Sequence, residues 1–84
     1  MKKEKKEKFD INTLKPFDRV LVRNDSSMGW EIEFWMAYKQ TCKNWKYLCL
    51  GAYYEQCIPY EGNEHLLLTK DMPDEYYITW EEEK

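Results

Sequence analysis

Residues 30–38 read Trp-Glu-Ile-Glu-Phe-Trp-Met-Ala-Tyr and form the most regular stretch of the chain. Apolar residues occupy every even position, and the first two odd positions are glutamates. Because successive side chains of a β-strand point to opposite faces, this period of two predicts a half-buried strand. We expect the residues that face the core to be Trp30, Ile32, Phe34, Met36 and Tyr38. The other face carries Glu31, Glu33, Trp35 and Ala37, and the Trp35 ring there is either exposed for binding or covers the second face of a strongly curved sheet.

Shorter stretches with strand composition lie on either side and are separated by turn residues. They cover residues 19–23, 45–50 and 53–58. Residues 64–69 fit either a helical turn or a last strand. Turns recurring every roughly eight to twelve residues, with hardly any helical periodicity, are typical of all-β domains. The sequence therefore predicts a mainly β fold, a small SH3-like antiparallel barrel of four to five strands with at most one short helical turn.

The chain has 84 residues, which is room for one compact domain. The lysine-rich residues 1–8 are predicted to be a disordered basic arm, and residues 9–70 to be the barrel. Residues 71–84 form an acidic segment in which residues 76–80 have strand composition. This segment either docks on its own domain or adds a strand to a partner or to a second copy.

Charge and hydropathy exclude several classes of protein. The net charge of -3 argues against a binder of long nucleic acid, which usually carries a strongly basic face. No stretch approaches the roughly 20 apolar residues of a membrane span, and the start of the chain does not resemble a signal peptide. We therefore expect a cytoplasmic protein. Cys42, Cys49 and Cys57 are an odd number of cysteines, so we expect reduced, buried thiols with no disulfide, metal or other cofactor.

Two blocks of sequence resemble a known family. KPFDRVLVR at residues 15–23 and QCIPYEGNEHLL at residues 56–67 resemble small uncharacterised proteins carried by phages, prophages and mobile elements of gut bacteria. The similarity spans about residues 14–69 and leaves out both tails. The resemblance implies an accessory role inside an infected bacterium, with counter-defence as the expected purpose. It supplies no catalytic residues.

Three features are candidates for binding. Residues 60–65 place two carboxylates, an amide and the one histidine around a glycine turn, which suits polar ligands. Residues 39–47, KQTCKNWKY, interleave lysines with aromatic rings, as nucleotide-binding loops do. The aromatic residues outnumber what a small core encloses, and aromatic side chains are enriched at interfaces. The candidate binding residues are Arg23, Trp35, Lys43, Trp45, Lys46, Tyr54, Tyr60, Glu61, Asn63 and Trp80.

These features lead to two hypotheses. In the first, a non-enzymatic protein binds and occludes a host bacterial protein through exposed aromatic and charged residues. In the second, it sequesters a small or cyclic nucleotide, with rings stacked on the base and Arg23, Lys43 or Lys46 on the phosphate. Either form is compatible with a homo-oligomer. Catalysis is not expected, because the sequence shows no set of acid–base residues held together in a pocket, and His65 is the only plausible general base.

Overall fold

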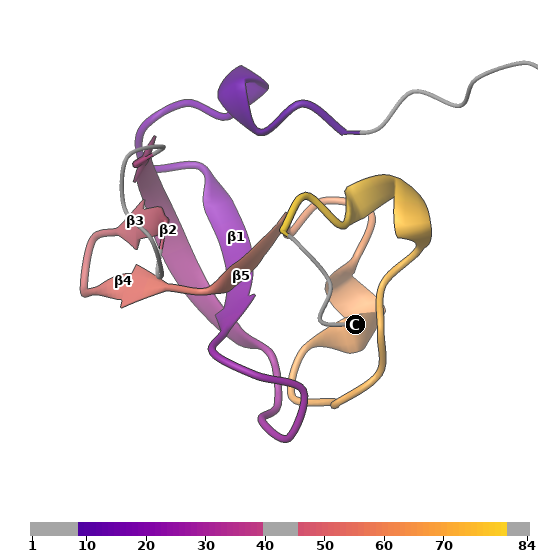
Figure 1. Cartoon of the computed structure of the whole chain (residues 1–84). Coiled ribbons are helices and arrows are strands. Elements are labelled where there is room, and N and C mark those ends of the chain that lie inside the picture. Colours follow the sequence, from indigo (N-terminus) through magenta and orange to yellow (C-terminus); the bar gives the residue numbers. More distant parts are fainter. Residues whose placement is uncertain (1–8, 40–45, 81–84) are drawn as a thin grey trace, which may run out of the picture.

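The computed structural model describes residues 9–39 and 46–80. Five antiparallel strands form one sheet in the order β4-β3-β2-β1-β5 (Figure 1). The strands are β1 (Arg19–Arg23), β2 (Glu31–Tyr38), β3 (Tyr47–Cys49), β4 (Tyr53–Tyr54) and β5 (Gln56–Pro59). Three short 3-10 turns flank the sheet, and they are η1 (Ile11–Thr13), η2 (Glu64–Leu66) and η3 (Glu75–Tyr77).

The mainly β class and the number of strands predicted from the sequence are confirmed. The sheet is not a closed barrel, because β4 and β5 are its two edges and do not pair with each other. The described part of the chain also contains more helical turns than the single one expected. Residues 64–66 form the turn η2, whereas Leu67 forms a parallel β-bridge with Trp30, so this stretch contains parts of both alternatives.

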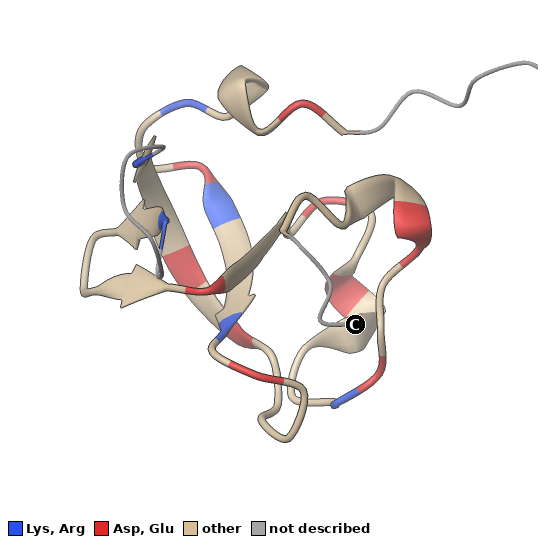
Figure 2. Ribbon diagram, viewed as in Figure 1, with Lys and Arg blue, Asp and Glu red and all other residues tan. Residues whose placement is uncertain are grey.

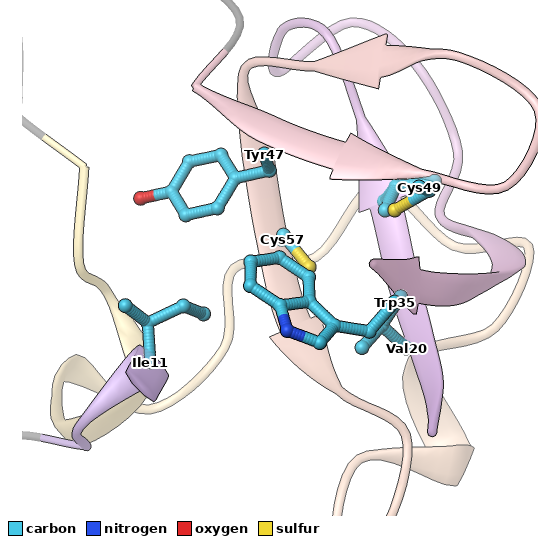
Figure 3. Close-up of a cluster of buried hydrophobic side chains, with 7 residues drawn as sticks. Ile11, Val20, Trp35, Tyr47, Cys49 and Cys57 are labelled. Atoms are coloured by element: carbon cyan, nitrogen blue, oxygen red, sulfur yellow. The ribbon is translucent and has the colours of Figure 1, made fainter. Parts of the chain in front are cut away.

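β1 lies next to β5 and β2 and is covered on both faces. Val20 and Val22 face a core that we call the Trp35 cluster, whereas Leu21 faces a second core that we call the Trp30 cluster. The Trp35 cluster consists of Ile11, Val20, Val22, Trp35, Tyr47, Cys49 and Cys57, most of which are labelled in Figure 3. The Trp30 cluster consists of Leu21, Trp30, Ile58 and Leu66.

The predicted alternation along residues 30–38 is wrong in part. Trp35 is only 3% exposed, so of its two alternatives the packed one is correct, whereas Ile32 and Phe34, expected inside, are 39% and 40% exposed. Since each face of the sheet carries a core over part of its area, an apolar residue can be buried on either face. The register between β2 and β3 also shifts between Trp35 and Ala37. The extra residue there reverses the alternation of the side chains that follow, so Tyr38 lies on the same face of the sheet as Trp35.

Residues 69–80 pack against the sheet instead of extending it. The strand expected over residues 76–80 is not formed, and η3 occupies part of that stretch. The ring of Trp80 lies 6.2 Å from that of Trp30, and the hydroxyl groups of Tyr47 and Thr79 are hydrogen-bonded at 2.8 Å. In Figure 1 this orange-to-yellow segment lies on the side of β1 and β5 away from β3 and β4. It covers most of the Trp30 cluster but leaves one end of that face open.

Candidate functional site

A groove of about 390 Å³ occupies the open end of the sheet face that carries the Trp30 cluster. It lies where β1 begins, beside the segments that precede β1 and follow β5. Aromatic rings and charged groups alternate along its walls. Its lining residues are Leu14, Phe17, Asp18, Arg19, Phe34, Pro59, Tyr60 and Glu61.

Strand pairing brings three of these side chains together. Arg19 of β1 is the register partner of Phe34 of β2, so both side chains point to the same face. On the other side of Arg19, the backbone N–H of Tyr60 donates to the Arg19 carbonyl oxygen at 3.1 Å. The Arg19 guanidinium then lies over the Tyr60 ring, 5.0 Å from its centroid, as a cation–π pair. The groove wall is therefore built on the central strands of the sheet.

Phe17 forms the rim of the groove from a strained turn. In residues 15–18 the Asp18 N–H donates to the Lys15 carbonyl oxygen at 3.0 Å, with Pro16 second and Phe17 third. Phe17 has a φ of 74°, which the third position of a type II turn requires and which normally selects glycine or asparagine. Its ring is nevertheless 63% exposed. A bulky ring is therefore held in solvent by a backbone conformation that disfavours it.

Two other turns show how unusual a phenylalanine is at the third position of such a turn. The turn at residues 60–63 carries Gly62 at its third position with a φ of 90°, as turn chemistry favours. The turn at residues 66–69 carries Leu68 there with a φ of 68°, and Leu68 is 77% exposed. Phe17 and Leu68 are thus the two most exposed large apolar residues of the described chain and also its two non-glycine residues with positive φ.

Charges of both signs line the groove. Asp18 and Glu61 supply carboxylates, and one Asp18 oxygen already accepts the Lys15 N–H at 2.9 Å. Arg19 supplies the one cation among the lining residues. Lys and Arg are otherwise scattered among Asp and Glu along the described ribbon (Figure 2), with no continuous basic track of the kind that phosphate backbones select.

Two residues singled out from the sequence lie in the groove, and a third supports it. Tyr60 and Glu61 are lining residues. Asn63 is buried, and its side-chain amide donates to the Pro59 carbonyl oxygen at 2.9 Å, which fixes the loop that carries Tyr60. The turn at residues 60–63 was the signal that made these residues recognisable.

The other aromatic candidates and Lys46 lie elsewhere. Trp35 is part of the core, where it packs among Val20, Tyr47 and Cys57 (Figure 3). Tyr54 is half-buried, and its hydroxyl donates to Glu33 Oε2 at 3.2 Å. Trp80 is half-buried against Trp30, and Lys46 is half-buried just before β3. Lys43 and Trp45 lie outside the described residues.

Arg23 is a buried side chain of β1 that hydrogen-bonds to β5 and to the C-terminal segment. It is 1% exposed, and its guanidinium lies 4.2 Å from the centroid of the Trp30 ring. Burial lowers the pKa of Arg23, and Asp25 opposes that effect. Its hydrogen-bond acceptors are Gln56 Oε1 at 2.7 Å, the carbonyl oxygens of Met28 at 3.4 Å and Lys70 at 3.1 Å, and Met72 Sδ at 3.1 Å. These bonds occupy the guanidinium, so Arg23 does not belong to the candidate site.

Sequence reasoning missed the anchoring part of the groove. Phe17 was not among the candidate binding residues, and Phe34 was expected to face the core. Their exposure follows from a backbone φ and from the way the C-terminal segment covers the sheet, neither of which has a sequence signature. The one sequence signal for this part of the groove was Asp18, a polar residue at the end of the turn that Pro16 begins.

The predicted burial is confirmed for the two cysteines that the structure describes. Cys49 and Cys57 are free and buried in the Trp35 cluster, and Cys42 lies outside the described residues. Burial raises the pKa of the Cys57 thiol well above its usual value, and the neighbouring Cys49 adds to this shift. Within residues 9–39 and 46–80, no three His, Cys, Asp or Glu side chains gather as metal ligands would.

Comparisons with known proteins give no family. No protein-family model matches the chain, and no curated protein or solved structure is significantly similar to it. No helix of the described residues has the length and apolarity needed to cross a membrane. The functional interpretation therefore depends on the chemistry of the groove.

Proposed function

We propose that this chain is a non-catalytic binding module that holds a partner protein in the groove around Phe17. The observation that carries the proposal is the exposed Phe17 ring at a φ of 74°. Leu68 shares this strain and exposure, but the Phe17 ring alone of the two lines a groove with other rings and charged groups, which is where strain points to a function. Rigid, exposed aromatic side chains are also the commonest hot spots of protein interfaces.

The resemblance to phage-borne proteins makes a bacterial host protein the expected partner. Occlusion of a defence or regulatory factor would then be the biological purpose. The groove supports this proposal because it combines apolar rings with carboxylates and a guanidinium, which suits a peptide segment with mixed chemistry.

Nucleotide capture has less support among the described residues. Arg23, one of its three phosphate ligands, donates its hydrogen bonds to internal acceptors. Of the other two, Lys46 is half-buried and Lys43 lies outside the described ranges. The groove offers one cation, Arg19, beside two carboxylates that repel phosphate.

The test is capture of a bacterial partner by matched variants. The wild-type protein, Phe17→Gly, Phe34→Ala and Leu68→Gly are immobilised, and stoichiometric proteins recovered from bacterial lysate are identified by mass spectrometry. Leu68→Gly is the control, because it removes an equally strained, exposed apolar residue from a turn outside the groove. We expect the partner to be lost with Phe17→Gly and Phe34→Ala and kept with Leu68→Gly. A partner retained by both groove variants would contradict the proposal.

A further inference from the structure

We infer that the groove takes a proline-rich segment in the polyproline II conformation with a basic residue beside it. This inference rests on the proposed function and specifies its partner. It follows from what the groove offers to a peptide backbone, to apolar side chains and to charge.

The groove offers no strand edge to an incoming backbone. β1 is hydrogen-bonded to β2 and β5, and β2 is hydrogen-bonded to β1 and β3, so the strands that carry Arg19 and Phe34 are paired on both sides. β5 is an edge strand, but the carbonyl oxygen of its residue in the groove, Pro59, already accepts a hydrogen bond from the Asn63 side-chain amide at 2.9 Å. An extended peptide would therefore leave its own N–H groups without partners here. A segment that lacks N–H groups, or satisfies them internally, fits instead.

Two kinds of segment remain, a helix and a polyproline II segment, and the hydrogen-bond donors in the groove distinguish between them. The Arg19 guanidinium and the Tyr60 hydroxyl are hydrogen-bond donors placed together by their cation–π contact. A helix uses its carbonyl oxygens internally, whereas a polyproline II segment has no internal hydrogen bonds and presents its carbonyl oxygens outward. A proline-rich segment therefore supplies acceptors to these donors and brings few N–H groups that need acceptors.

The rings and carboxylates favour the same occupant. Proline-rich segments dock on grooves lined by aromatic side chains, and they lose little conformational entropy because the polyproline II form is already populated. Phe17, Phe34 and Tyr60 provide such a lining, and Pro59 and Leu14 extend its apolar surface. Asp18 and Glu61 outnumber Arg19, which itself lies on the Tyr60 ring, so a Lys or Arg next to the prolines gains complementary charge.

The experiment is a selection from a random dodecapeptide display library on the full-length protein, with prior depletion on the Phe17→Gly variant. Phe17-dependent peptides are sequenced. One is then titrated into isotope-labelled protein by NMR together with two altered forms, one with every proline replaced by alanine and one with its basic residue replaced by glutamate. Leu68→Gly is the control protein.

We expect the selected peptides to be enriched in closely spaced prolines beside Lys or Arg, and to shift the backbone signals of Phe17, Arg19, Phe34 and Tyr60. The alanine form should bind at least about tenfold more weakly and the glutamate form about fivefold more weakly. Leu68→Gly should bind like the wild type.

Phe17-dependent peptides without proline, or an alanine form that binds as well as its parent, would overturn this inference and leave the groove as a site for another peptide conformation. Recovery of no Phe17-dependent peptide would also overturn it. In either case the proposed function is tested separately, by whether Phe17→Gly loses the bacterial protein that the wild type captures.

Discussion

The backbone N–H of Phe17 donates to the carbonyl oxygen of Trp35 at 2.7 Å. The N–H of Trp35 in turn donates to the carbonyl oxygen of Asp18 at 2.8 Å. The most exposed aromatic ring of the described chain is therefore attached by its backbone to a residue whose own ring is in the core. This pairing holds the Phe17 turn in place before any partner arrives, which lowers the entropy cost of binding.

Phe17→Gly should lose partner binding without losing stability. Glycine adopts the φ of 74° freely, which removes strain of about 1 kcal/mol, while its greater freedom in the unfolded chain offsets part of that gain. We expect the free energy of unfolding in urea to stay within about 1 kcal/mol of the wild-type value. A loss well beyond that would show that the ring supports the fold.

Arg23→Met should destabilise the protein strongly. The substitution keeps much of the apolar stem but leaves Gln56 Oε1 and the carbonyl oxygen of Lys70 without their donor. Loss of these part-buried hydrogen bonds, which also connect β1 to the C-terminal segment, should lower the free energy of unfolding by about 2–4 kcal/mol. Urea denaturation measures this loss. The control is Arg19→Met, which is exposed and should cost less than about 1 kcal/mol.

Alkaline pH should unfold the domain through buried tyrosine. Burial raises the pKa of Tyr47 to about 12, even though its hydrogen bond with Thr79 acts in the opposite direction. A group whose folded pKa is raised contributes stability below its unfolded pKa and loses it as pH rises through the folded value. Stability should therefore fall between about pH 10 and about pH 12.

The contribution of Tyr47 to this loss of stability is measured by repeating the pH series on the Tyr47→Phe variant. Tyr47→Phe cannot ionise at this position, so its stability should depend less on pH over that interval. Tyr54, whose pKa is also raised to about 12, by burial and then by Glu33, and the buried Cys57 thiol, whose pKa is raised as well, contribute to the slope that remains. Unfolding curves at successive pH values measure both slopes, and equal slopes for the variant and the wild type would contradict the assignment to Tyr47.

Cys57 should react with alkylating reagents only after unfolding. The thiolate is the reactive form, and burial holds the pKa of Cys57 well above its usual value. In a Cys42→Ser background, iodoacetamide followed by peptide mass mapping should leave Cys49 and Cys57 unmodified in buffer and modify both in urea. Alkylation of Cys57 in the native protein at the rate of a free cysteine would show that the Trp35 cluster is open to solvent.

Much of the fold was predictable because it depends on local chemistry. The turn at residues 15–18 follows from Pro16, the turn at residues 60–63 follows from Gly62, and the strand at residues 30–38 follows from its alternating pattern. Tyr60 and Glu61 were recognised as candidates because polar residues cluster around that glycine turn. The burial of Cys49 and Cys57 followed from the apolar character of free cysteine.

The sequence by itself thus determined that the domain is mainly β, and it located β1, β2 and the turn at residues 60–63. Only the tertiary structure decided which face of β2 is core, because both faces are partly covered and the bulge between Trp35 and Ala37 leaves no sequence signature. It likewise decided that Arg23 is internal and that Phe17 is exposed. Those outcomes depend on residues 69–80 covering one end of a sheet face and leaving the other open, a long-range contact that no local pattern encodes.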